Sequence, residues 1–185
     1  MLTDEELLAK AQQLEPDALR ALHQRFYGMV ARYIQMKVSD SHMVEDLSGE
    51  VFVRVLEGLQ RGKGWRDSPQ GWIMGIARHV VADHYRQQEK RREMPLSEHL
   101  PAEETDAPFQ QAVHNERKRL LWQALRQLTD EQRDVIILRF MGGIDIKSVA
   151  IAINKTPGAV KALQHRALRA LAEKMDGLRP RSHKK

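Results

Sequence analysis

Four polar side chains near residue 160 have the types and the spacing that a helix needs to read DNA. They are Lys161, Gln164, His165 and Arg166. Lysine and arginine bind phosphates or guanine edges, glutamine can pair with adenine, and histidine can donate to either. Apolar residues recur among them at steps of three and four: Val160, Leu163, Ala167 and Leu171. We therefore expect one helix with a buried face and a basic outer face near the end that would enter a major groove.

The residues before this helix have the spacing of a helix-turn-helix. A first helix is expected over residues 145–154, where Ala150 is small enough for a second helix to cross closely. Asn154 tolerates a left-handed turn, and Thr156 can cap a helix whose first residue is Pro157. The pattern favours DNA binding, and the alternative is a helical hairpin with a solvated basic face.

The residue chemistry gives no support for an enzyme. The chain of 185 residues has no cysteine, which excludes a disulfide framework, a thiolate nucleophile and a thiolate zinc site. His79 and Asp83 share a helix face, but no third ligand or nucleophile is apparent nearby, and a hydrogen bond on the helix surface is the expected role of the pair. We therefore expect no catalytic residue, no metal and no cofactor.

Charge is unevenly distributed along the chain, although its net value is only +5. Residues 61–92 hold 8 basic and 3 acidic residues, and residues 147–185 hold 10 basic and 2 acidic ones. Between these segments, residues 93–106 hold 5 acidic residues and no basic one. Two basic surfaces that contact a polyanion, held apart by an acidic tether, are expected. Two solvated helix faces are the alternative.

The chain is predicted to be all-α. Thr3 with Glu6 and Thr129 with Gln132 fit capping boxes, and Ser68 fits an N-cap before a proline at the first helical position. Apolar residues follow the helical period in four segments, with breaks in the last of them at 128–129, 142–143 and 154–157. These segments are 19–33, 44–59, 72–80 and 109–175.

Residues 93–108 differ from the rest, because they contain three prolines and five acids without a periodic apolar face. This composition is typical of an extended linker. We predict two small helical domains, 1–92 and 109–176, joined by this flexible acidic linker and followed by a basic tail, 177–185. An acidic N-terminus and the lack of a run of about 18 uncharged apolar residues predict a cytoplasmic protein without membrane insertion.

Several segments, in this order, resemble the extracytoplasmic-function sigma factors of the sigma-70 family, which are two-domain initiation subunits of bacterial RNA polymerase. The first half carries the resemblance in residues 45–54 and 72–79, with Asp83 and Arg86. The second half carries it in 125–133, 138–140, the helix-turn-helix and 165–168. The resemblance implies a helical bundle like sigma region 2 in the first domain and a helix-turn-helix like region 4 in the second.

The resemblance also implies roles for particular residues. Asp46, Glu50 and Arg54 would dock on core RNA polymerase, and their spacing of four puts them on one helix face. The candidates for recognition and melting of the −10 promoter element are Trp65, Arg66, Asp67, Ser68, Arg78, His79, Asp83 and Arg86. The candidates for the −35 element are Lys155, Thr156, Lys161, Gln164, His165 and Arg166. For Trp65, core packing and a place in a pocket for an unstacked base are both open.

The partners that the resemblance implies are core RNA polymerase, promoter DNA and an anti-sigma factor that clamps the two domains. The alternative to a sigma factor is a stand-alone helix-turn-helix regulator with an N-terminal dimerisation or sensing domain. The two functions differ in one observable property. A regulator would bind a duplex operator alone, whereas a sigma factor would bind promoter DNA well only together with polymerase.

Overall fold

The protein is described by a computed structural model that covers residues 3–38, 40–92 and 120–178. Its helices are α1 (Asp4–Gln12), α2 (Pro16–Gln35), α3 (Ser41–Gln60), α4 (Pro69–Arg92), α6 (Asp130–Ile136), α7 (Ile146–Ala152) and α8 (Pro157–Leu178), with one π-helical stretch, η1 (Ile137–Met141). Residues 120–126 are also helical. The predicted linker 93–108 and the tail beyond 178 lie outside the described residues. Within the described ranges, no helix combines the length and apolarity needed to cross a membrane.

Local sequence signals set the helix ends where they were predicted. Thr3 and Thr129 each form a capping box with the residue three positions later. Ser68 caps α4 by accepting a hydrogen bond from the Gly71 N–H at 3.0 Å. Asn154 has a φ of 53°, the left-handed conformation expected at the turn. The predicted all-α fold is confirmed.

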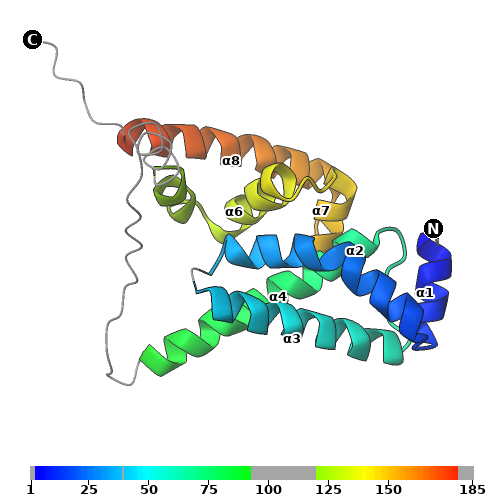
Figure 1. Cartoon of the computed structure of the whole chain (residues 1–185). Helices are drawn as coiled ribbons and strands as arrows, with labels where there is room; N and C mark the ends of the chain where they lie inside the picture. The colour runs from blue at the N-terminus through cyan, green and yellow to red at the C-terminus, as the bar shows by residue number, and fades with distance from the viewer. Residues whose placement is uncertain (1–2, 39, 93–119, 179–185) are drawn as a thin grey trace, which may run out of the picture.

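The N-terminal half, residues 3–92, is built on α2, α3 and α4, which pack against one another. Phe26, Val51 and Ile73 supply fully buried side chains, one from each of these helices. Burial of such apolar faces is the main source of stability in a small helical domain. The short α1 closes one end of this bundle (Figure 1).

The C-terminal half, residues 120–178, places α7 and α8 around the helix formed by α6 and η1. A small cluster of Leu125, Leu128, Ile136 and Ala167 joins residues 120–128 to α6 and α8. Gly143 lies between η1 and α7 and has a φ of 65°, which a residue with a Cβ rarely adopts.

The two halves are packed against each other, although the sequence predicted basic surfaces held apart. Figure 1 shows α6, α7 and α8 as a layer over α2, α3 and α4. The main contact is between α4 and α7, and one apolar core runs through both halves. Gly71 permits it: a Cβ there would lie 2.7 Å from the carbonyl oxygen of Ser148. Close packing at a glycine is a tertiary effect that charge and composition do not reveal.

Candidate nucleic-acid interface

The helix-turn-helix consists of α7, a four-residue turn and α8. Asp145 caps α7, because its side chain accepts from the backbone N–H groups of Lys147 at 2.8 Å and Ser148 at 3.0 Å. A hydrogen bond from the Ser148 hydroxyl lowers the pKa of Asp145, so the cap remains charged. Thr156 caps α8 by accepting from the Ala159 N–H at 3.2 Å. Caps on both helices fix the start of α8 relative to α7.

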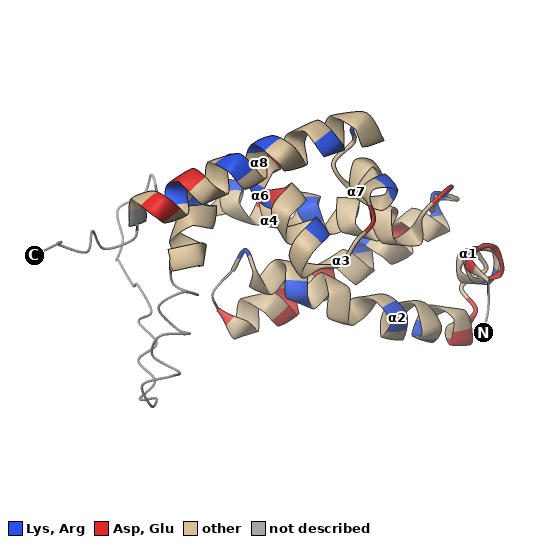
Figure 2. Ribbon diagram, turned by 90° about the horizontal axis from the view of Figure 1, so that it is seen from above, with Lys and Arg blue, Asp and Glu red and all other residues tan. Residues whose placement is uncertain are grey.

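The first turns of α8 carry a buried apolar face and an exposed polar face. Val160 and Ala167 are fully buried, whereas Lys161, His165 and Arg166 are exposed. Figure 2 shows basic residues along the outer side of α8. A helix presented in this way can contact phosphates and base edges.

The other −35 candidates are partly engaged within the protein. Gln164 is half-buried, and its side-chain oxygen accepts from Arg139 Nε at 3.3 Å. Lys155 pairs with Glu131 at 2.9 Å, and Thr156 serves as a cap. Three of the −35 candidates can therefore contact a ligand without breaking such an internal contact. They are Lys161, His165 and Arg166.

The acidic face of α3 is exposed at Asp46 and Glu50, which lie one turn apart. Arg54 is half-buried and donates to Glu50 at 2.7 Å and to Asp83 of α4 at 2.9 Å. Arg86 also pairs with Asp83, at 3.1 Å. Arg54 and Asp83 thus connect the predicted docking helix to the predicted −10 helix. Val53, 55% exposed on α3, was not among the sequence candidates.

Trp65 lies in the loop before α4 and is buried, with 5% of its surface exposed. Its ring packs beside Trp72, with 6.0 Å between ring centroids. Of the two possibilities left open by the sequence, the structure favours core packing. The neighbouring Arg66 and Asp67 are exposed, as is His79 on α4.

Ser68, another −10 candidate, lies against the other half of the chain. Its hydroxyl oxygen is 2.7 Å from the hydroxyl oxygen of Ser148, the residue whose hydroxyl also donates to Asp145. The caps of α4 and α7 therefore meet at one point, where the two halves touch.

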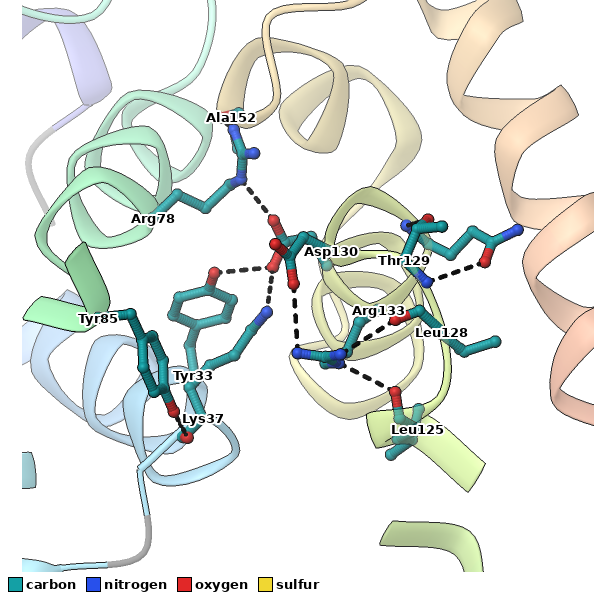
Figure 3. Close-up of polar contacts among 12 residues, drawn as sticks. Tyr33, Lys37, Arg78, Tyr85, Leu125, Leu128, Thr129, Asp130, Arg133 and Ala152 are labelled. Atoms are coloured by element: carbon teal, nitrogen blue, oxygen red, sulfur yellow. Dashed lines mark hydrogen bonds and ion pairs between the residues drawn. The ribbon is translucent and has the colours of Figure 1, made fainter. Parts of the chain in front are cut away.

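Arg78 is engaged with the C-terminal half in the same way. Its Nε lies 2.6 Å from Asp134, and its guanidinium donates to the carbonyl oxygen of Ala152 at 3.3 Å. Lys37 Nζ lies 2.6 Å from Asp134, and the Tyr33 hydroxyl donates to Asp134 at 3.0 Å. Figure 3 shows Tyr33, Lys37 and Arg78 converging from one side. Arg78, which was predicted to contact DNA, is thus paired with the Asp134 carboxylate inside the protein.

Asp134, Lys37 and Tyr33 were not singled out from the sequence. Asp134 directly precedes four apolar residues that are all buried, and it is itself only 4% exposed. A charged residue beside such an apolar run indicates a buried ion pair, but which residues pair with Asp134 cannot be read from the sequence. Among the described residues, no group of three metal-ligating side chains is present.

Two family models match the chain. Residues 19–91 match Sigma-70 region 2, and residues 118–171 match Sigma-70 region 4. Two similar relatives are ECF RNA polymerase sigma factors: BldN of Streptomyces coelicolor, 33% identical, and SigX of Bacillus subtilis, 34% identical. The alignments cover 90% and 88% of this chain. They span 64% of the length of BldN and 86% of that of SigX.

Solved structures share the fold. CnrH in complex with the cytosolic domain of CnrY aligns with a TM-score of 0.68 at 21% identity, over 94% of this chain and 97% of that one. The sigma factor RpoE in complex with the anti-sigma factor NepR from Bartonella quintana aligns with a TM-score of 0.61 at 17% identity, over 86% and 98%. The two region matches and the 34% identity to SigX show that the chain belongs to the ECF RNA polymerase sigma factors of the sigma-70 family.

Proposed function

We propose that this sigma factor directs core RNA polymerase in the cytoplasm to promoters through three surfaces. The acidic face of α3 docks on polymerase, the loop 61–68 and α4 contact the −10 element, and the first turns of α8 contact the −35 element. The observation that carries the proposal is the basic, exposed face of α8 at Lys161, His165 and Arg166, on a helix fixed by caps. This is the arrangement that a major groove accepts.

Control by an anti-sigma factor is part of the proposal. The fold is shared with CnrH and with RpoE, whose structures hold the cytosolic domain of CnrY and the anti-sigma factor NepR, respectively. A protein that covers α4 and α8 would block both DNA contacts at once. Copurification of the chain with candidate binding proteins, followed by inhibition of transcription, tests this part.

Run-off transcription with purified core polymerase on a library of promoter fragments tests the proposed function. The chain should produce defined transcripts only together with core polymerase, and the selected promoters should share two separated elements. A chain that binds duplex DNA tightly without polymerase, and yields no transcript with it, would support the stand-alone regulator instead.

Replacement of both Asp46 and Glu50 by alanine should weaken binding to core polymerase about tenfold, because two exposed carboxylates of the docking face are lost. The matched control replaces Asp17 and Glu89, exposed acids on α2 and α4, and makes the same change in net charge. Fluorescence titration of labelled protein with core polymerase measures both affinities. Equal affinities in the two double variants would place the docking face elsewhere.

Arg166→Ala should weaken holoenzyme binding to a promoter by about 5- to 150-fold, the range for loss of one bidentate contact to a base. Lys174→Ala, an exposed cation in the last turns of α8, is the control and should have a much smaller effect. Binding is measured on a promoter with an intact −35 element and on one with that element scrambled. If Arg166 contacts a base, the loss of affinity caused by Arg166→Ala should disappear on the scrambled promoter. An unchanged affinity on the intact promoter would show that Arg166 does not read the −35 element.

A further inference from the structure

Lys37 and Arg78 are two cations of the N-terminal half that share one carboxylate of the C-terminal half. Each lies 2.6 Å from a different oxygen of Asp134. The Tyr33 hydroxyl adds a hydrogen bond of 3.0 Å. The Lys37 and Asp134 side chains are only 7% and 5% exposed. Three donors, from α2, the turn directly after it and α4, therefore surround a carboxylate that α6 places between them.

Within the described part of the N-terminal half, these donors have no acidic partner. Among the described residues, the ion pairs of Lys37 and Arg78 lead only to Asp134. Burial, together with the neighbouring Asp134 carboxylate, raises the pKa of Tyr33 well above its ordinary value, so the phenol keeps its proton. Two cations and one hydroxyl donor aimed at the same point suit an anion with at least two oxygens, such as a carboxylate or a phosphate.

We propose that Tyr33, Lys37 and Arg78 form a binding site for a backbone phosphate of DNA, and that Asp134 fills this site while the two halves are packed together. The proposal rests on the proposed function in that it takes promoter DNA as the ligand of the N-terminal half. Both cations are in direct contact with Asp134, so the carboxylate and a phosphate exclude each other. DNA reaches the site only after α6 moves away, and the packed arrangement therefore inhibits DNA binding.

A fluorescein-labelled single strand of twenty thymidines probes the site in the absence of polymerase, because it offers phosphates without a promoter sequence. Asp134→Asn preserves the shape of the side chain and removes its charge. We expect its affinity for this strand to exceed that of the wild type about tenfold, since apparent affinity scales with the fraction of molecules in the competent state.

Asp130→Asn is the matched control. It makes the same change in net charge on the same helix, but Asp130 has an 87% exposed side chain and pairs with Arg133 within the C-terminal half. Its affinity should stay within about twofold of the wild type, because exposed charges are screened by salt. Equal gains in Asp130→Asn and Asp134→Asn would show that net charge alone is responsible and would overturn the proposal.

Lys37→Gln in the Asp134→Asn background tests the site itself. It should remove the gain and reduce the slope of log affinity against log salt by about 0.7, the value for one phosphate contact on a single strand. A gain in affinity that persists in this double variant overturns the proposal.

Gly71→Ala changes no charge and provides a second way to separate the two halves, so it should give a similar gain in affinity for the thymidine strand. Separated halves with unchanged affinity would also overturn the proposal.

Run-off transcription with core polymerase is measured on the same proteins. Because the thymidine strand is bound without polymerase, failure of transcription contradicts the proposed function and leaves the phosphate site standing. Loss of the binding pattern with normal transcription contradicts the phosphate site alone.

Discussion

The Trp65→Ala variant is expected to lose about 3–5 kcal/mol of unfolding free energy. Trp65 is 5% exposed, and its ring lies 6.0 Å from that of Trp72 at an interplanar angle of 54°. Truncation would leave a cavity between the loop 61–68 and the rest of the apolar core, and a close-packed bundle fills such a cavity only in part. Urea unfolding followed by circular dichroism at 222 nm measures the loss.

The same variant distinguishes the two roles that the sequence allows for Trp65. If the indole only formed a pocket for a DNA base, its removal would weaken promoter opening and change stability by less than about 0.5 kcal/mol. Trp65→Phe keeps much of the apolar volume and should recover most of the stability. Arg66→Ala, in the same loop but exposed, is the control and should unfold like the wild type. A fully stable Trp65→Ala protein would contradict the core role.

Gly71→Ala is expected to separate the two halves of the chain. A Cβ at this position would lie 2.7 Å from the carbonyl oxygen of Ser148 and 2.9 Å from Cβ of Ile151. Neither atom can move away by rotation of a side chain. Overpacking of this kind costs about 1–3 kcal/mol, and the chain avoids the cost when α7 moves off α4. Small-angle X-ray scattering measures the result, as an increase over the radius of gyration of about 16 Å for a compact chain of this length.

Gly75→Ala is the matched control for this experiment. Gly75 also lies on α4 and faces α7, but a Cβ there would be 3.6 Å from the carbonyl oxygen of Ala152, an ordinary contact. Each substitution replaces glycine with alanine inside the same helix and raises its intrinsic helix propensity by about 1 kcal/mol. A difference in radius between the two variants therefore reports the interface. Identical radii would show that Gly71 does not control the packing of the two halves.

The helices could be predicted from the sequence because their signals are local. The capping residues Thr3 and Thr129 and the turn residue Asn154 act within three or four positions of themselves. The polar outer face of α8 follows from periodicity alone, since apolar residues occupy its other face. Thus the DNA-facing candidates at Lys161, His165 and Arg166 are exposed, as predicted, while their role in reading the −35 element stays a prediction.

The packing of the halves could not be predicted, because it depends on pairs far apart in the chain. Asp134 meets Tyr33 across 101 positions and Arg78 across 56. The acidic linker, as a sequence, is compatible with separated and with packed halves. One local signal was present in Gly71 and Gly75, since small residues four apart on one helix permit close approach of another helix. The burial of Trp65 was undecidable, because an aromatic residue in a loop suits a core as well as a binding pocket.

The contact between Ser68 and Ser148 also has a direction, which follows from counting protons. Each hydroxyl carries one proton. Ser148 gives its proton to Asp145, so Ser68 must be the donor in the bond between the two serines, while it accepts from the Gly71 N–H. When the halves part, this single bond is exchanged for a bond to water. The N-caps of α4 and α7 both survive the exchange, so the first turn of each helix stays capped after the halves separate.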